Sequence, residues 1–391
     1  MGLTFEPLGK YVRMVDERNT NMVTESVLGI NIDKYFMPSV ANVIGTDLSN
    51  YKLLRKGRFA CNPMHVGRDG RLPVSRYAED VPAIVSPAYF MFEIIDENEI
   101  EPEYLMLCFR RPDFDRMCWF RTDASVRGGI TWDDVCALTI PVPSIDEQRK
   151  IVHDYQVITD RIKLLRKMNE KLIEACNAYY HFVFETHDEY WEEKSDWYKP
   201  LGNALSRVAM GPFGSNIKTD CFVSSGVPVL NGNNISTFLL VENEFRYVEP
   251  QKALELRNSI AHSGDIVITH RGTLGQAALI PDRTKYKEYV ISQSQFLLTC
   301  DRDTLIPEYL LFYFHTPYGK RALLANDNTT GVPSIAKPTT YIKSLRVPIP
   351  PMKYQKKWRE LANTGLMYIS NNNSEIEMME TAKRALLEKI I

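Results

Sequence analysis

The chain contains one segment twice, and this repeated segment decides the fold. Residues 140–148 read IPVPSIDEQ, and residues 347–355 read VPIPPMKYQ, 207 positions later. Upstream, PEYL at 102–105 recurs at 307–310, GRF at 57–59 matches GDI at 264–266, and IVS at 84–86 matches VIS at 290–292. Four landmarks in the same order, with offsets of 205 to 207 residues, indicate an internal duplication.

Each copy is predicted to consist of a globular segment and a long helix. The globular segments, residues 1–143 and 198–350, contain short apolar runs separated by Gly, Pro, Asn and Asp, which is typical of β-strands and turns. Pro102 and Pro307 open shorter helices, because proline is tolerated at the first position of a helix. The long helices are expected at residues 144–190 and 351–391. The predicted fold class is α+β.

Apolar residues in the long helices follow a heptad pattern with charged residues between them, which predicts a coiled coil. Ser144 and Glu147 resemble a capping box at the start of the first helix. Gly365 and three asparagines at 371–373 make the second helix intrinsically weaker. We expect the helices to pair as an antiparallel coiled coil; the alternative is that each packs on its own globular segment. The expected interface residues are Ile151, Ile158, Ile162, Leu165, Trp358, Leu361, Met379 and Leu386.

The composition is that of an ordinary globular protein. The 391 residues are 44% hydrophobic and 25% charged, and the length predicts two or three domains. No run of about 18 apolar residues is present, and the first residues lack the pattern of a secretory signal. The seven cysteines form no Cys-x-x-Cys pair. We expect a cytoplasmic protein with reduced thiols and no membrane association.

Motifs for catalysis or metal binding are not found. The segment GPFGSNIKT at 211–219 resembles a phosphate-binding loop, but Asn216 stands where the second glycine belongs. The seven histidines show no metal-ligand spacing. We therefore expect no catalytic residue, no metal and no cofactor in this chain.

The net charge of −2 is unusual for a free-standing nucleic-acid binder, yet the charge is unevenly distributed. Residues 1–145 hold 16 basic and 20 acidic side chains, and residues 195–351 hold 16 basic and 13 acidic ones. Loops rich in Arg, Asn and Gln suit contacts with base edges and phosphates; the alternative is that these loops are simply solvated. The candidate DNA-binding residues are Arg68, Arg71, Arg76, Arg127, Ser215, Asn216, Lys218, Asn233, Arg271 and Gln276.

This order of parts resembles the specificity subunit of type I restriction-modification enzymes. The likeness rests on two globular segments, each followed by a helix that begins Pro-x-Pro-x-x-x-x-Gln, and on GPFGS at 211–215 and GDIVI at 264–268, which look like parts of that family's target-recognition domains. The first copy lacks the Phe-Gly-Ser element, Tyr354 replaces Glu147, and Trp358 replaces Ile151. These departures leave the equivalence of individual loops open.

The resemblance implies a non-catalytic, sequence-specific DNA-binding subunit. Each target-recognition domain would read one half of a bipartite site in double-stranded DNA, and the two helices would set the gap between the halves. Two DNA adenine methyltransferase subunits with S-adenosylmethionine, and restriction subunits with ATP and Mg, would be the partners. Two alternatives remain open: a non-catalytic scaffold with two β-rich ligand-binding modules, or a self-contained DNA modification enzyme.

Overall fold

The computed structural model describes residues 4–40, 45–64, 66–122, 128–186, 195–328 and 332–390. The chain divides into two compact units. Unit 1 comprises residues 1–162 and 379–391, and unit 2 comprises residues 163–378. The boundary between the units therefore lies within both long helices. The sequence predicts boundaries at the ends of the helices, where they join the globular segments. We call the globular parts domain 1 (residues 4–143, in unit 1) and domain 2 (residues 195–351, in unit 2).

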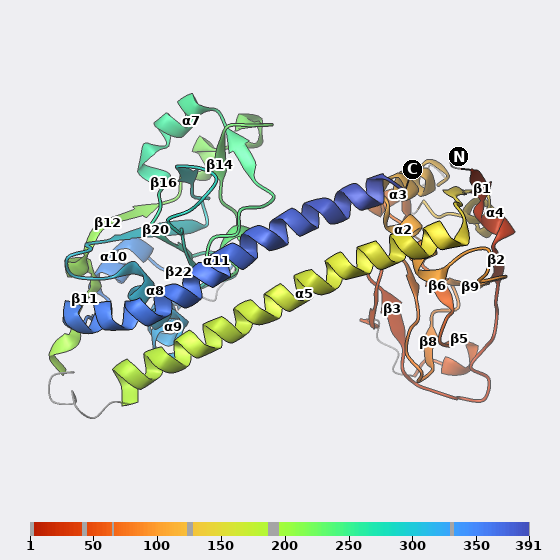
Figure 1. Cartoon of the computed structure of the whole chain (residues 1–391), viewed down its shortest axis with the longest axis horizontal. Helices are drawn as coiled ribbons and strands as arrows, with labels where there is room; N and C mark the ends of the chain where they lie inside the picture. Colours follow the sequence, from red (N-terminus) through yellow and green to blue (C-terminus); the bar gives the residue numbers. More distant parts are fainter. Residues whose placement is uncertain are drawn as a thin grey trace. The chain divides into compact units, whose positions relative to one another are not determined.

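Domain 1 consists of short strands followed by helices, and it leads into the first long helix, α5 (Figure 1). The strands are β1 (Phe5–Pro7), β2 (Val12–Met14), β3 (Leu28–Ile30), β4 (Phe36–Pro38), β5 (Lys52–Leu54), β6 (Phe59–Cys61), β7 (Val74–Arg76), β8 (Ala83–Val85), β9 (Phe90–Ile94) and β10 (Thr139–Pro141). The helices are α1 (Val66–Asp69), α2 (Pro102–Arg110), α3 (Pro112–Phe120), α4 (Trp132–Cys136) and α5 (Ile145–His181).

Domain 2 has the same plan and leads into the second long helix, α11. The strands are β11 (Tyr198–Pro200), β12 (Leu205–Met210), β13 (Phe222–Val223), β14 (Val227–Val229), β15 (Arg246–Val248), β16 (Ile260–Ala261), β17 (Ile266–Thr269), β18 (Ala277–Leu279), β19 (Tyr289–Val290), β20 (Gln295–Cys300), β21 (Asp327–Asn328), β22 (Ser334–Ile335) and β23 (Arg346–Pro348). The helices are α7 (Pro250–Glu255), α8 (Pro307–His315), α9 (Pro317–Leu324), α10 (Pro338–Ser344) and α11 (Met352–Glu388).

The two domains are built on the same antiparallel sheet. Domain 1 orders its four strands β2-β9-β6-β7, and domain 2 orders its strands β12-β20-β17-β18. The registers match as well, because Phe59 pairs with Phe92 in one sheet and Ile266 pairs with Leu298 in the other. Ile266 follows Phe59 by 207 residues, and Leu298 follows Phe92 by 206 residues. These are the offsets of the repeated sequence landmarks. The duplication expected from the sequence is therefore a duplication of topology.

A second pair of strands repeats in the same way. Strand β5 pairs with β8 so that Leu53 lies opposite Ile84, and β16 pairs with β19 so that Ile260 lies opposite Val290. All four residues are buried. In domain 2 this pair belongs to a five-stranded sheet of order β13-β15-β14-β19-β16, whereas in domain 1 it is a two-stranded sheet, with one parallel bridge from Ile84 to Val27 just before β3. The second sheet is thus more extensively paired in domain 2 than in domain 1.

The helix starts are fixed by side chains that the sequence singles out. Ser144 and Glu147 form the predicted capping box: the backbone N–H of Glu147 donates to Ser144 Oγ (3.4 Å), and the N–H of Ser144 donates to Glu147 Oε2 (3.3 Å). Gln148 and Gln355, at the corresponding positions of the two helices, are fully buried. Each of these glutamines joins its helix to its own domain by hydrogen bonds.

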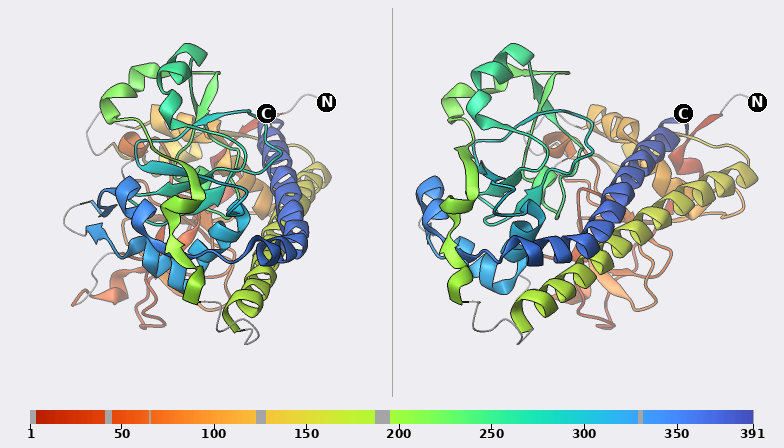
Figure 2. Two further views of the ribbon diagram at one scale, coloured as in Figure 1. Left: turned by 90° about the vertical axis from the view of Figure 1, so that its left-hand side faces the viewer. Right: turned by 60° about the vertical axis from the view of Figure 1, so that its left-hand side comes forward.

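In unit 2, α5 and α11 lie against each other and run in opposite directions, as expected (Figures 1 and 2). The ring of Tyr180 meets that of Trp358 edge to face, with 5.8 Å between the centroids. A Cβ placed on Gly365 would lie 2.8 Å from Cys176 Sγ, so the absence of a side chain allows the two backbones to approach closely. Residue numbers fall along α11 as they rise along α5, which makes the pair antiparallel.

An asparagine layer, formed by Asn169 of α5 and by Asn372 and Asn373 of α11, continues the pairing in unit 2. Asn372 Nδ2 donates to Asn169 Oδ1, and Asn169 Nδ2 donates to Asn373 Oδ1, both at 2.8 Å. Because Asn372 is buried, its amide depends on this partner. The asparagines that weaken α11 as an isolated helix are thus used between the helices.

In unit 1, the start of α5 and the end of α11 pack on domain 1. Ile390 belongs to the domain 1 core, and Leu387, Ile151 and Tyr155 pack against that core. The ammonium group of Lys383 lies 5.0 Å from the centre of the Tyr155 ring. Each long helix therefore contacts both its helical partner and a globular domain, which combines the two arrangements that the sequence left open.

The predicted interface residues have different environments. Ile162, Leu165 and Trp358 are buried, and Ile151, Ile158, Met379 and Leu386 are half-buried. Leu361 is 62% exposed, which corrects its prediction as an interface residue. The buried face of α11 instead runs through Trp358, Ala362, Gly365, Ile369 and Asn372. Small residues in this face permit close helix packing. A prediction based on large apolar side chains does not include them.

Candidate nucleic-acid interface

One end of the four-stranded sheet in domain 2 brings four loops together. Because the strands alternate in direction, β12 and β17 end where β18 and β20 begin. The loops at this end are residues 211–218, 270–276 and 291–294, and residues 231–236 join them through a hydrogen bond from Gln295 Nε2 to the carbonyl of Asn231 (3.1 Å). We call this set the loop end of domain 2.

Backbone contacts fasten these loops to one another. The N–H of Gly211 donates to the carbonyl of Gln295 (2.8 Å), and the N–H of His270 donates to the carbonyl of Ser294 (2.9 Å). A Cβ on Gly232 would lie 3.8 Å from Gln276 Oε1. Six predicted DNA-binding residues are therefore gathered at the loop end, namely Ser215, Asn216, Lys218, Asn233, Arg271 and Gln276.

The loop end offers uncompensated positive charge and free amides. Lys218 and Arg271 are exposed, and neither has an ion pair with any residue that the structure describes. Asn233 is exposed, and Gln276 is half-buried. Cationic and amide side chains on loops of this kind can contact phosphates and form paired hydrogen bonds with base edges.

His270, which precedes Arg271, is held in place at the loop end. Its Nε2 lies 3.2 Å from the carbonyl oxygen of Gln293. Burial lowers the pKa of His270 from its ordinary value, and the neighbouring Arg271 guanidinium lowers it further. The imidazole is therefore neutral at physiological pH, and the positive charge beside it belongs to Arg271.

In domain 1, the loop between β6 and β7 corresponds to the Arg271 loop, and Arg68 and Arg71 lie in it. Both guanidinium groups are exposed, but each has a carboxylate partner, with Arg68 2.7 Å from Asp69 and Arg71 3.1 Å from Asp33. Exposed pairs of this kind are weak, so these arginines can exchange their partners for a ligand.

Two other predicted residues of domain 1 do not join that loop. Arg76 lies at the opposite end of β7, where its guanidinium contacts Glu103 of α2 at 2.9 Å. This end of the strand points away from the β6–β7 loop, so Arg76 lies apart from Arg68 and Arg71 and ties the sheet to α2. Arg127 lies outside the described residues.

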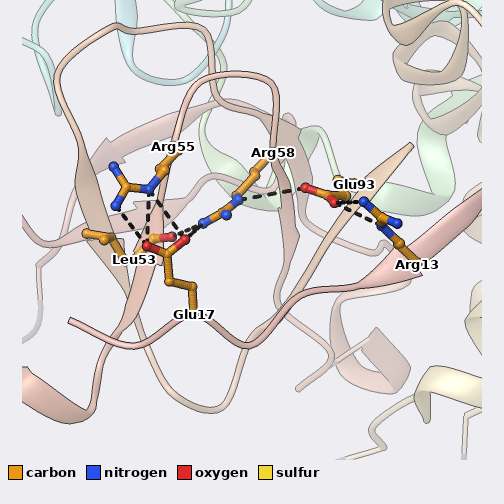
Figure 3. A network of polar contacts seen from close by, with 6 residues as sticks. All are labelled: Arg13, Glu17, Leu53, Arg55, Arg58 and Glu93. Carbon is orange, nitrogen blue, oxygen red and sulfur yellow. Dashed lines mark hydrogen bonds and ion pairs between the residues drawn. The ribbon is translucent and has the colours of Figure 1, made fainter. Parts of the chain in front are cut away.

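The remaining arginines near the start of β6 form an internal network with acidic residues (Figure 3). Glu17 is 2.8 Å from Arg55 and 2.6 Å from Arg58, and Glu93 is 2.7 Å from Arg13. The hydrogen bond from Arg55, followed by contacts with Arg58, lowers the pKa of Glu17. Arg55 and Arg58 are therefore neutralised within the domain, which accords with the acidic balance of residues 1–145.

The described residues contain no group of three or more His, Cys, Asp or Glu side chains placed to hold a metal ion. All seven cysteines are free thiols. Burial raises the pKa of Cys108 and of Cys118 to about 12, so neither is a thiolate at neutral pH. Over the described part of the chain, each helix is too short or too polar to cross a bilayer.

One residue at the loop end is not among the sequence-based candidates. Phe213 is 81% exposed, although it is a large apolar side chain. Phe213 lies between two glycines, Gly211 and Gly214, and the polar candidates of this loop follow it. Its side chain forms no hydrogen bonds, so residue type alone does not predict a role in DNA binding; the glycines at 211 and 214 are the sequence signal that marks its loop.

Comparisons with known proteins agree with this architecture. Residues 226–361 match the family model described as the type I restriction modification DNA specificity domain. The MjaX type I restriction enzyme specificity subunit of Methanocaldococcus jannaschii is 22% identical over 168 residues, which are 42% of this chain and 39% of that protein. The chain thus spans well under half the length of this curated relative.

A solved structure extends the likeness to the whole fold. The crystal structure of the type I restriction-modification system S subunit from M. genitalium covers 100% of this chain and 96% of its own, with a TM-score of 0.53 and 14% identity. At this identity the likeness concerns the fold. Residues 226–361 therefore match the type I restriction modification DNA specificity domain, the same topology is repeated in the first half of the chain, and the chain as a whole is similar in fold to an S subunit.

Proposed function

We propose that this chain is the subunit that recognises a bipartite DNA sequence for a type I restriction-modification enzyme. The observation that carries the proposal is the repeated sheet, β2-β9-β6-β7 and β12-β20-β17-β18, with corresponding loops at one end of each copy. Two domains of one design on one chain suit a target made of two half-sites. Domain 2 would read its half-site through the loop end, where Arg271, Gln276 and Asn233 carry the groups that distinguish bases.

The helix pair would hold the two domains at a set separation. Each long helix has 37 residues, which at about 1.5 Å per residue gives a length of roughly 55 Å. Major-groove faces one turn apart are separated by about 34–36 Å. The asparagine layer and the Gly365 contact support a fixed register between the helices, and a fixed register gives a defined gap.

The partners proposed for this chain are two DNA adenine methyltransferase subunits, which use S-adenosylmethionine, and restriction subunits, which use ATP and Mg. The charge of the chain supports this division of labour. Non-specific affinity for DNA grows with the number of phosphates that a protein neutralises, and a chain with a net charge of −2 neutralises few. Other subunits would supply much of that surface, while this chain selects the sequence and leaves the chemistry to them.

A direct test combines the chain with a type I methyltransferase subunit and maps methylated adenines across a host genome. The expected result is one bipartite motif. Replacing residues 1–143 with the first domain of another family member should change one half of the motif only, and a change in both halves would contradict independent reading. Two controls address the alternatives. A scaffold would leave the motif independent of this chain, and a self-contained modification enzyme would transfer methyl groups without a partner.

A further inference from the structure

The loop of residues 211–218 holds Phe213 on a closely packed backbone. A Cβ on Gly211 would lie 1.8 Å from the carbonyl oxygen of Ser292, and a Cβ on Gly214 would lie 2.6 Å from Gln293 Oε1. Glycine at 211 therefore lets the loop lie directly on the backbone of the turn before β20, and Gly214 lies beside the end of the Gln293 side chain. Pro212 between them is buried. The backbone that leads into Phe213 is thus held against the sheet by Gly211 and Pro212.

A hydrogen-bonded turn completes this arrangement. The N–H of Asn216 donates to the carbonyl of Phe213 at 2.8 Å, and the ring itself is 81% exposed. An aromatic side chain has few rotatable bonds, so little conformational entropy is lost when such a ring meets a ligand. A ring held out from a rigid turn is suited to binding, because folding leaves its apolar surface uncovered.

The neighbours of Phe213 indicate which surface it meets. Ser215, Asn216 and Lys218 follow it in the same loop. Through Gln293 and His270 the loop adjoins Arg271, and through Gln295 it adjoins Asn231. Hydrogen-bonding side chains of these types read the major groove, where each base pair presents a distinct pattern. The only apolar group displayed there is the 5-methyl group of thymine.

We propose that Phe213 recognises the 5-methyl group of one thymine in the half-site bound by domain 2. This inference rests on the proposed function and adds an apolar contact to the polar readers of the loop end. Burying one methyl-sized group contributes about 0.8 kcal/mol, which corresponds to roughly a fourfold change in affinity. Phe213 would thus add specificity for an A·T pair without a hydrogen bond.

The test uses the full complex of this chain with its methyltransferase subunits and the motif found by methylation mapping. Each thymine of the domain 2 half-site is replaced in turn by deoxyuridine, which removes one methyl group and leaves base pairing intact. Binding is compared for the wild-type chain and Phe213→Ala. We expect one position at which deoxyuridine weakens wild-type binding about fourfold, and at which it has no effect on Phe213→Ala.

Leu254→Ala is the matched control. Leu254 is 62% exposed on α7, which follows the end of β15 that points away from the loop end. This variant should keep the wild-type response to deoxyuridine. Both variants should keep the wild-type midpoint of thermal unfolding, because both side chains are exposed.

Three results would overturn the proposal: a domain 2 half-site without an A·T pair, equal responses of wild type and Phe213→Ala at every position, or a loss of affinity in Phe213→Ala that is uniform over all sequences. The last result would instead indicate a wedge inserted between base steps. Failure of the proposed function is distinguishable, since the wild-type complex would then not prefer its own site to a scrambled one.

Discussion

Gln148 and Gln355 make equivalent sets of three hydrogen bonds in the two copies. Gln148 accepts from the N–H of Glu101 (2.9 Å) and donates to the carbonyls of Glu99 (3.0 Å) and Pro143 (2.9 Å). Gln355 accepts from the N–H of Ile306 (2.9 Å) and donates to two carbonyls at 3.0 and 2.7 Å. Each glutamine joins the first turn of a long helix to the segment before α2 or α8. The same contact therefore fixes the angle between helix and domain in both copies.

Replacing Gln148 by leucine should destabilise unit 1 by about 2–4 kcal/mol, because two carbonyls and one N–H lose their partner in a buried place. Urea unfolding measures this change. Gln355→Leu should have a similar effect on unit 2. Gln156→Leu is the control, since Gln156 is exposed on α5, and its effect should stay within about 0.5 kcal/mol. Equal effects of Gln148→Leu and Gln156→Leu would contradict the assigned role.

Gly365→Ala should destabilise the protein, although alanine favours a helix by about 1 kcal/mol over glycine. The new Cβ would lie 2.8 Å from Cys176 Sγ, and no other atom outside its own helix lies within 4 Å of it. In a Cys176→Ala background the same change should stabilise by about 1 kcal/mol. Thermal unfolding of the four proteins gives the coupling, and additive effects would show that the sulfur atom is not the obstacle.

The pH dependence of stability should report on His270. Burial lowers the pKa of His270 in the folded protein below its ordinary value of 6.5, so the unfolded chain binds more protons between the two values. Stability should therefore fall as the pH drops below about 6.5. His270→Gln keeps a donor for the Gln293 carbonyl and should reduce this slope, and the part that remains belongs to His315, whose pKa is also lowered by burial. His262→Gln, at an exposed position, should leave the profile unchanged; an equal flattening would assign the effect elsewhere.

The length of the helix pair should determine the gap in the recognised sequence. Inserting seven residues after Ile162 and seven after Ile376 keeps the heptad pattern in both helices and adds roughly 10 Å to the pair. Methylation mapping should then show a longer gap between unchanged half-sites. An insertion in α5 alone places the paired residues out of register and should abolish methylation. Altered half-site bases at an unchanged gap would refute this role.

The duplication and both long helices could be predicted from the sequence because their signals are periodic and local. Strands β6 and β17 are buried runs, and their positions follow from the landmark offsets. The buried face of α11 could not be predicted from apolar size, since Ala362 and Gly365 occupy positions where a small residue permits close packing. Apolar size predicts Leu361 at the interface, yet this side chain is exposed.

The candidate site was only partly visible in the sequence. Residues of the 211–218 and 270–276 loops could be chosen by type, but their association depends on the strand order. The ion pair between Arg76 and Glu103 joins residues far apart in the chain, and no local pattern announces it. The exposure of Phe213 cannot be predicted from the sequence, because it depends on how closely Gly211 lets its loop approach Ser292.

The asparagine layer restricts how new spacings can arise in descendants of this protein. Asn169 comes from one half of the duplication, and Asn372 and Asn373 come from the other. A deletion or insertion in a single helix would leave an asparagine amide buried without its hydrogen-bond partner. Such a variant would be less stable, and selection would act against it. Compensated changes in both helices are the accessible evolutionary route, so natural gap lengths should differ in discrete steps.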